Sequence, residues 1–323
     1  MNILFLSHRI PYPPDKGDKI RSFHLISHLS DNHSIDLVSL LEDETDDASA
    51  EHMKNYCAHV HAEPAYKYLN IFRRIRKNRP FTASHFYYPS IQKHIDAILS
   101  ESRIDTILCY CSGMAEYVFQ SKRYRQNRLR GIRLVIDFVD LDSDKWRQYA
   151  EHSRGPHRWI YRSETRRMAK YERQIANRFA ASLVVSRAES DLLQAITGVR
   201  GQVVGNGIDF GYFSNLPPRQ REQAVIFVGT MDYLPNVEGV LHFHRHSWPL
   251  IRESCPQARW YIVGRNPLPA IQVLQDSRVV VTGMVPDIRT YLARASVGIA
   301  PLRLARGLQN KVLEYLAAGL PVV

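Results

Sequence analysis

The chain has 323 residues, of which 45% are apolar and 23% are charged. This length and composition are typical of a folded protein with two domains, and they exclude a disordered chain or one built of membrane-spanning helices. The net charge of +11 favours an anionic partner, such as a nucleic acid, an acidic membrane surface or a phosphorylated substrate. The opening apolar run is too short for a secretory signal, and no basic residue precedes it, so a cytoplasmic location is predicted.

Strand-like and helix-like segments alternate along the first 200 residues. The run NILFLSHRI predicts a strand, which leads through a Pro-rich turn and Gly17 into a helix. Further strands are predicted at 35–41, 106–110, 134–139 and 183–186, with amphipathic segments of helix length between them. Such alternation is typical of a doubly wound parallel sheet.

A second series of strands is predicted at 225–229, 260–264, 279–282 and 297–300. The turn-rich segment 205–223 separates the two series, so we place one domain at 1–205 and the other at 206–323. The sequence stops one strand after a helix predicted over 308–318. We therefore expect the second domain to be truncated at its C-terminus.

The four cysteines are too few and too scattered for a disulfide framework. We expect all of them to be buried thiols, and two of them to share one predicted strand: Cys57, Cys109, Cys111 and Cys255.

Two glycines stand where a predicted strand turns into a helix, Gly229 in VIFVGTMDYLPN and Gly264 in WYIVGRNP. A glycine there lets the backbone approach a phosphate, while the helix that follows offers unpaired N–H groups. A single strand-end glycine is more often structural, and neither segment has the three-glycine dinucleotide fingerprint, which argues against NAD.

The segment APLRLARGLQNKVLEYLAAGLPVV predicts a helix that follows Gly307. Lys311 and Glu314 lie three residues apart, hence on one face near the start of this helix. A lysine there can neutralise a diphosphate, and a glutamate can accept hydrogen bonds from vicinal ribose hydroxyls. The alternative is an ordinary Lys–Glu pair on the surface.

Four segments of the chain resemble glycosyltransferase family 4, in particular the sugar transferases associated with exopolysaccharide and PEP-CTERM systems. They are VIDFVDLDSDKWRQYA, VVGNGIDFGYF, FVGTMDYLPNVEGVLHF and VPDIRTYLARASVGIAPLRLARGLQNKVLEYLAAGLPVV. The resemblance implies a GT-B architecture, with two Rossmann-like domains facing a cleft, the acceptor on the side of 1–205 and a nucleoside-diphosphate sugar on the side of 206–323. It also implies a retaining reaction that needs no metal and no cofactor, with a glycan or a polyprenyl-linked acceptor in exopolysaccharide biosynthesis.

The resemblance also implies roles for residues of the donor site. Glu314 corresponds to the second glutamate of the family's paired motif, which contacts the donor ribose. Lys311 and Gly307 would face the diphosphate. The base would be framed by the backbone at Met284 and Val285, with Arg265 nearby.

Two positions depart from the family pattern. Arg306 stands where the first glutamate of the paired motif is expected, and the basic residues usual after the strand-end glycine are missing between 230 and 237. Arg306 would then share the phosphate charge with Lys311, and the donor sugar stays open. In the first domain, Gly17 would approach the pyrophosphate or the acceptor, and Asp140 stands near the point where the family carries an acceptor-side histidine.

Residues 120–180 hold 16 Lys and Arg against 7 Asp and Glu. This basic stretch, which includes a helix predicted over 154–178, would hold the enzyme on an anionic leaflet at the inner face of the plasma membrane, or it is simply a solvated face.

Other functions are less well supported by the residues. Asp140, Asp142 and Asp144 are spaced like calcium ligands, but Lys145 stands where a calcium loop needs glycine, so no metal site is predicted. His242 and His246 are expected to be surface residues on one helix face. The remaining alternatives are a nucleotide-sugar epimerase of the same fold, and a nucleic-acid-binding module, for which interleaved stacking aromatic residues are missing.

Overall fold

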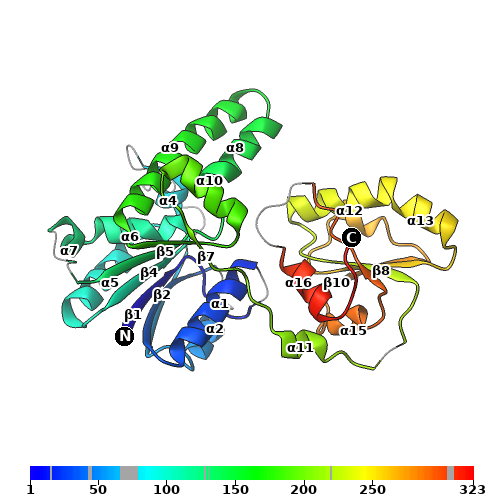
Figure 1. The fold of residues 1–323 in the computed structure, drawn as a ribbon, viewed down its shortest axis with the longest axis horizontal. Helices are drawn as coiled ribbons and strands as arrows, with labels where there is room; N and C mark the ends of the chain where they lie inside the picture. Colours follow the sequence, from blue (N-terminus) through cyan, green and yellow to red (C-terminus); the bar gives the residue numbers. More distant parts are fainter. Residues whose placement is uncertain are drawn as a thin grey trace. The chain divides into compact units, whose positions relative to one another are not determined.

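The computed structural model describes residues 1–323 except for 15–16, 43–45, 66–78, 127–128, 130, 219 and 304–308. The chain divides into two compact units, Met1–Asn206 and Gly207–Val323. Each unit contains its own parallel sheet with helices packed against it (Figure 1). The α/β fold class predicted from the sequence is therefore confirmed in both units, which are described separately below.

The first unit is built on seven parallel strands in the order β3-β2-β1-β4-β5-β6-β7. The central strands are almost entirely apolar, because helices cover both faces of a parallel sheet. The order reverses direction between β1 and β4, which pair in a register that places Ser7 beside Tyr110. The strands are β1 (Asn2–Ser7), β2 (Ser34–Leu41), β3 (His59–Pro64), β4 (Thr106–Tyr110), β5 (Arg133–Asp137), β6 (Ala181–Val184) and β7 (Gln202–Val203).

Helices connect these strands and form two hydrophobic clusters. Successive residues of β1 point to opposite faces, so that Phe5 packs in the cluster of Ile26 and Met53, whereas Leu6 packs in the other cluster. The helices are α1 (Gly17–Ser30), α2 (Asp46–Met53), α4 (Phe81–His85), α5 (Pro89–Glu101), η1 (Ser112–Met114), α6 (Ala115–Gln120), α7 (Lys122–Arg125), α8 (Asp142–His152), α9 (Pro156–Arg178) and α10 (Arg187–Thr197).

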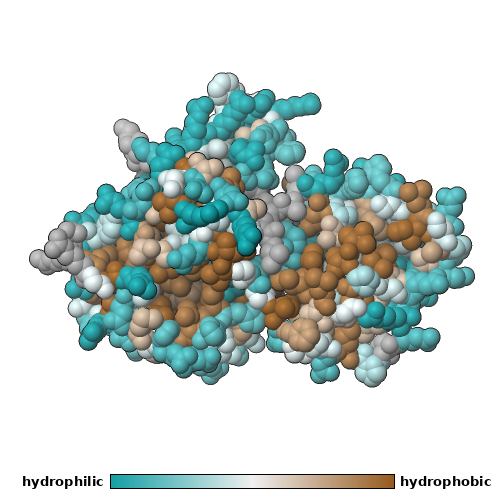
Figure 2. All heavy atoms as spheres, in the orientation of Figure 1, coloured by the Kyte–Doolittle hydropathy of each residue, from teal (hydrophilic) through white to brown (hydrophobic). Residues whose placement is uncertain are grey.

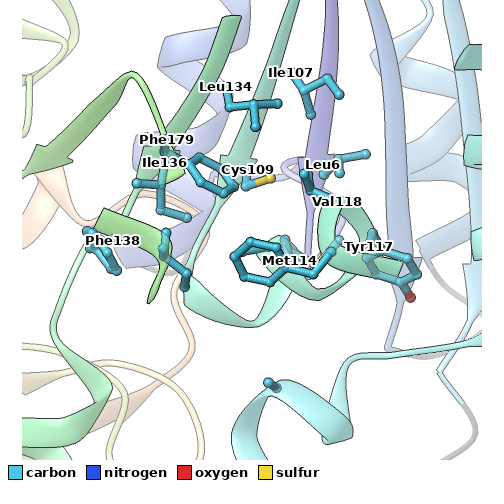
Figure 3. Packing of buried hydrophobic residues seen from close by; sticks show 14 of the residues in the cluster. Leu6, Ile107, Cys109, Met114, Tyr117, Val118, Leu134, Ile136, Phe138 and Phe179 are labelled. Atoms are coloured by element: carbon cyan, nitrogen blue, oxygen red, sulfur yellow. The ribbon is translucent and has the colours of Figure 1, made fainter. Parts of the chain in front are cut away.

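The larger cluster lies on one face of the first sheet (Figure 3). Ile107, Cys109 and Ile136 come from the strands and meet Met114 and Tyr117, which follow β4. Burying each large apolar side chain contributes about 1.5–3 kcal/mol. This packing fixes the segment that follows β4, at the carboxyl end of the sheet.

The second unit has four parallel strands in the order β10-β9-β8-β11. One cluster packs Val240 of its longest helix against Phe227 and Trp260, and the other packs Tyr315 against Ile226 and Tyr261. The elements are α11 (Phe210–Ser214), β8 (Ala224–Val228), α12 (Leu234–His246), α13 (Trp248–Ser254), β9 (Arg259–Val263), α14 (Pro269–Gln272), β10 (Val279–Gly283), α15 (Arg289–Leu292), β11 (Val297–Gly298) and α16 (Asn310–Ala317).

Some element boundaries differ from those predicted. β3 and β7 were not predicted, because β3 is a partly exposed edge strand without an apolar run and β7 has only two residues. β5 ends at Asp137 rather than at residue 139, since Val139 has a φ of 61° and leaves the extended conformation.

The prediction of four buried thiols is wrong for two of them. Cys57 and Cys109 are buried, whereas Cys111 is half-buried and Cys255 is exposed. Cys111 does not lie on a strand but follows β4 with a φ of 75°, and Cys255 follows α13 at the surface.

Candidate functional site

The carboxyl end of the second sheet brings Gly229, Asn236 and Lys311 together. They come from the end of β8, the first turn of α12 and the first turn of α16. Nζ of Lys311 donates a hydrogen bond to Oδ1 of Asn236 at 2.9 Å. A Cβ atom on Gly229 would lie 2.7 Å from Nδ2 of Asn236 and 3.3 Å from Nζ of Lys311. The glycine therefore leaves the space that the amine and the amide need.

Lys311 is the one lysine in the sequence from 207 to 323, and it is only 8% exposed. Its Nζ also lies 3.9 Å from the centroid of the Phe227 ring, a favourable position for a cation. Burial lowers the pKa of Lys311 to about 7, although the neighbouring Glu314 opposes this shift. Lys311 is therefore not a solvated surface residue, and an anion placed beside it would favour its protonated form.

Asn236 was not predicted from the sequence as part of this site. Its Nδ2 donates to the carbonyl of Thr230 at 2.9 Å, which turns Oδ1 toward Lys311. The only signal in the sequence was an asparagine near the start of the helix that follows Gly229. That signal is weak, because polar residues are common at helix starts.

Glu314 lies one turn after Lys311 on α16. Burial raises the pKa of Glu314 to about 7, against the influence of Lys311, which lowers it. Tyr315 fixes this helix, because its hydroxyl oxygen accepts a hydrogen bond from the backbone N–H of Val228 at 2.7 Å. The cation and the carboxylate thus occupy the end of α16 that lies against the carboxyl end of β8.

The ends of β8 and β9 approach each other closely at two glycines. Gly264 has a φ of +150°, and a Cβ atom built on it would lie 1.7 Å from the carbonyl oxygen of Gly229. Only glycine fits there. The next residue, Arg265, is half-buried, and its carbonyl accepts a hydrogen bond from the backbone N–H of Met231 at 2.9 Å.

The remaining predicted residues of the second unit are only partly covered. Met284 and Val285 follow the carboxyl end of β10, which is separated from β8 by β9. Met284 is 81% exposed. Val285 packs against the cluster that contains Ile226 and Tyr315. Arg306 and Gly307 lie outside the described residues.

The predicted residues of the first unit lie near the carboxyl ends of its strands. Gly17 is the exposed first residue of α1, and Asp140 is half-buried between β5 and α8. The neighbouring carboxylates bond to the protein: Asp142 accepts from the hydroxyl of Ser112, and Asp144 pairs with Arg147. In the part of the chain that the structure describes, no three His, Cys, Asp or Glu residues are arranged to hold a metal ion.

Comparison with known proteins finds a family model that covers most of the second unit. Residues 222–323 match the family model "Glycosyl transferases group 1". No curated protein matches the chain in sequence.

Solved structures match almost the whole chain. The sucrose-phosphate synthase of Thermosynechococcus elongatus is 16% identical with a TM-score of 0.69, and the match covers 100% of this chain and 80% of that one. HepE of Anabaena, solved with UDP and glucose, is 17% identical with a TM-score of 0.64 and the same coverage. A UDP-N-acetylglucosamine 2-epimerase homologue of Listeria monocytogenes is 12% identical with a TM-score of 0.54, covering 99% and 78%. At these identities the structural matches establish the fold alone.

The structural matches give this chain a GT-B fold, and its second unit matches the model of the group 1 glycosyl transferases. The matched segment, residues 222–323, is almost the whole of the second unit, Gly207–Val323. Gly229, Asn236, Lys311 and Glu314 all lie within the matched segment.

Proposed function

We propose that the chain moves a sugar from a nucleoside-diphosphate sugar to a glycan or polyprenyl-linked acceptor in exopolysaccharide biosynthesis, with retention of configuration. The observation that carries this proposal is the buried amine of Lys311 beside the gap at Gly229. In open α/β sheets, ligands bind beyond the carboxyl ends of the strands, where this pair lies.

The ammonium of Lys311 and the N-terminus of α16 would meet the diphosphate, because both offer positive charge to an anion. Glu314 would accept hydrogen bonds from the ribose hydroxyls. Met284, Val285 and Arg265 would frame the base, and Arg306 and Gly307 stay predicted diphosphate contacts. Gly17 and Asp140 stay the predicted residues on the acceptor side.

The configuration of the transferred sugar is retained if the acceptor attacks the same face of the sugar from which the diphosphate departs. The leaving diphosphate helps to take the acceptor proton, and Lys311 stabilises the charge that develops on it. No metal is required in this scheme, so transfer should persist in a chelator. Loss of activity in EDTA, restored by manganese, would contradict this scheme and make Asp140, Asp142 and Asp144 the first residues to test.

Calorimetry on three variants tests the donor site. Glu314→Gln should lower the affinity for sugar nucleotide by roughly 10- to 150-fold, because a hydrogen bond to a charged group contributes about 1.5–3 kcal/mol. Lys311→Ala should cost at least as much for sugar nucleotide and nucleoside diphosphate, but little for the nucleoside. Glu253→Gln, an exposed position on α13, is the matched control. Unchanged affinities in the Glu314 and Lys311 variants would refute the assignment.

The donor itself is identified by thermal-shift screening of UDP-, GDP- and ADP-sugars, since a ligand at 100 times its dissociation constant stabilises by about 2.7 kcal/mol. The same panel addresses the alternative of an epimerase, which the similarity to the Listeria structure keeps open. An epimerase changes the donor sugar without any acceptor. A transferase releases nucleoside diphosphate at a rate that depends on acceptor.

A membrane surface is the partner that we propose for the helical hairpin α8–α9. Near the start of α9, Trp159 and Ile160 are 74% and 61% exposed. The helix carries seven cations, Arg158, Arg162, Arg166, Arg167, Lys170, Arg173 and Arg178. Mostly hydrophilic residues cover this hairpin in Figure 2. None of the described helices is long and apolar enough to cross a membrane. Peripheral attachment to an anionic leaflet at the cytoplasmic side accounts for both the cations and the exposed apolar side chains.

A cavity lined by this hairpin and by α4 supports a lipid-linked acceptor. Its volume is about 620 Å³, and its lining combines aromatic and aliphatic side chains with two arginines. The lining includes Phe81, Trp146, Trp159, Ile160, Arg79 and Arg167. An isoprenoid chain matches the apolar wall, and a phosphate attached to it matches the arginines.

A further inference from the structure

His8 and Cys111 are neighbours at the point where the strand order of the first sheet reverses. His8 directly follows β1 and Cys111 directly follows β4, one residue beyond the paired Ser7 and Tyr110. Adjacent strands lie about 4.8 Å apart. The space beyond the carboxyl ends at such a reversal is where open α/β sheets bind ligands.

The imidazole of His8 is held in one orientation. Its Nε2 lies 3.3 Å from Oδ2 of Asp18 in the first turn of α1. The ring is stacked with Tyr110 and meets Phe86 edge-on, with centroid distances of 6.0 and 5.1 Å. Nδ1, on the other side of the ring, is shielded from solvent and has no hydrogen-bond partner within the described part of the chain.

The contacts of His8 and Asp18 shift the pKa values of both side chains. Burial alone would lower the pKa of His8, but Cys111 and Asp18 outweigh it and raise this pKa to about 10. Burial alone would raise the pKa of Asp18, but His8 and Arg9 hold it well below its usual range. The imidazole of His8 therefore holds a proton strongly once the Cys111 sulfur carries a negative charge, and its Nε2 side faces the carboxylate of Asp18.

Cys111 differs from the other three thiols. Its φ of 75° lies in a region that side-chain-bearing residues rarely adopt, and its N–H donates to the carbonyl of Asp137 at 2.8 Å. Such strained positions persist when the surrounding structure fixes them, and they cluster at functional sites. Cys57 and Cys109 are buried, and Cys255 is exposed.

We propose that Cys111 is a reactive thiol, with His8 as its base and Asp18 as the carboxylate that orients the base, and that it is a modification site for peroxides and other soft electrophiles. The thiol proton passes to Nδ1 of His8, and the thiolate sulfur attacks one oxygen of the peroxide. The O–O bond breaks, and the leaving oxygen takes the proton from His8. Cys111 becomes a sulfenic acid, and hydrogen peroxide is reduced to water. This site lies in the first unit and goes beyond the proposed transfer, which gives Cys111 no role.

Pulsed alkylation of the full chain with iodoacetamide at pH 7, followed by mass spectrometry of each cysteine peptide, tests the proposal. Cys111 should react at least 10-fold faster than the exposed Cys255, because an ordinary thiol is only a few per cent thiolate at this pH. Dilute hydrogen peroxide followed by dimedone should label Cys111 first. His8→Gln should bring the rate at Cys111 down to that of Cys255 or below, and Asp18→Asn should lower it in part.

The other thiols report whether each variant is folded. Cys57 and Cys109 should stay unlabelled in the parent and in the variants, since both are buried. If His8→Gln exposes them, the comparison rests on Asp18→Asn. A rate at Cys111 no higher than at Cys255, or a rate that a folded His8 or Asp18 variant leaves unchanged, would overturn the proposal. Nucleotide binding to the second unit is measured separately, so either proposal can fail alone.

Discussion

Arg21 and Asp137 form an ion pair that is buried from solvent, with side chains 3% and 0% exposed. Nε and Nη2 of Arg21 lie 2.9 and 2.8 Å from Oδ2 of Asp137. Nη1 donates to the carbonyl oxygens of Val204 and Gly205 and to Oδ1 of Asn206. One guanidinium therefore ties α1 and β5 to the last residues of the first unit.

Asp137→Ala should destabilise the first unit by about 3–5 kcal/mol, because it leaves a buried guanidinium without its counter-charge. The measurement is the urea midpoint, with limited proteolysis at 204–206 as a local readout. Asp191→Ala is the control, since Asp191 pairs with Arg200 at 3.1 Å but both side chains are more than half exposed. That change should cost less than about 1 kcal/mol. Equal midpoints for the two variants would contradict the prediction.

Gly264→Ala should unfold the second unit or cost it several kcal/mol. The added Cβ would lie 1.7 Å from the backbone carbonyl of Gly229, and a φ of +150° is unfavourable for alanine in any case. Gly207→Ala is the matched control, because a Cβ there meets no atom within 4 Å. It should be neutral or slightly stabilising. Thermal denaturation of both variants would decide, and a Gly264→Ala protein as stable as the control would show that the two strand ends are not packed as described.

The sequence predicted those parts of the fold and site that depend on local pattern. Buried parallel strands such as β4 are continuous apolar runs, so their positions were predicted to within a few residues. Lys311 and Glu314 were singled out because both lie on one helix face, and Gly229 because it ends an apolar strand.

Contacts between distant segments were not predictable in this way. Asn236 meets Lys311 across 75 positions, and no local period relates them. The same holds for Arg21 with Asp137, and for His8 with Cys111, which become neighbours only through the order of the strands. Edge strand β3 lacks the apolar pattern, because its side chains are only partly buried.

Binding of nucleoside diphosphate should be strongest near neutral pH and weaker in alkali. The pKa of Lys311 is about 7 in the free protein, because burial disfavours its charge. A bound diphosphate raises this pKa, so binding takes up a proton above pH 7, and the affinity falls by up to about 10-fold per pH unit. Calorimetry in buffers of different ionisation enthalpy measures the uptake. Lys311→Ala should abolish it, and a pH-independent affinity in the parent protein would exclude this role for Lys311.

The proposed role of Glu314 implies the opposite pH dependence for the affinity of the nucleoside. Burial raises the pKa of Glu314 to about 7, so the carboxylate that accepts the ribose hydrogen bonds is lost as the pH falls below 7. Nucleoside affinity should therefore weaken in acid, and Glu314→Gln should remove the dependence. A parent protein whose nucleoside affinity is the same at pH 5.5 and pH 8 would contradict this role.

Charge reversal on α9 should release the protein from anionic vesicles. Each cation near an anionic leaflet contributes about 1 kcal/mol, and Arg162, Arg166 and Lys170 are three of the seven on this helix. Changing all three to Glu should abolish sedimentation with phosphatidylglycerol vesicles at low salt, and the binding of the parent protein should weaken as salt is added. Reversal of Lys54, Lys93 and Arg103, which are exposed elsewhere on the first unit, is the charge-matched control.

The double variant Trp159→Ala and Ile160→Ala tests whether apolar side chains of α9 insert into the membrane, in addition to the attraction between its cations and the anionic lipids. These exposed side chains would enter the interface between headgroups and acyl chains, so their loss should weaken binding by at least 10-fold while the salt dependence persists. The charge-reversed protein should instead lose the salt dependence together with the binding. If the control reversal releases the protein as fully as the α9 reversal does, attraction depends on net charge alone, and the hairpin is not the docking surface. If parent and α9 variant sediment equally, α9 makes no contact with the leaflet.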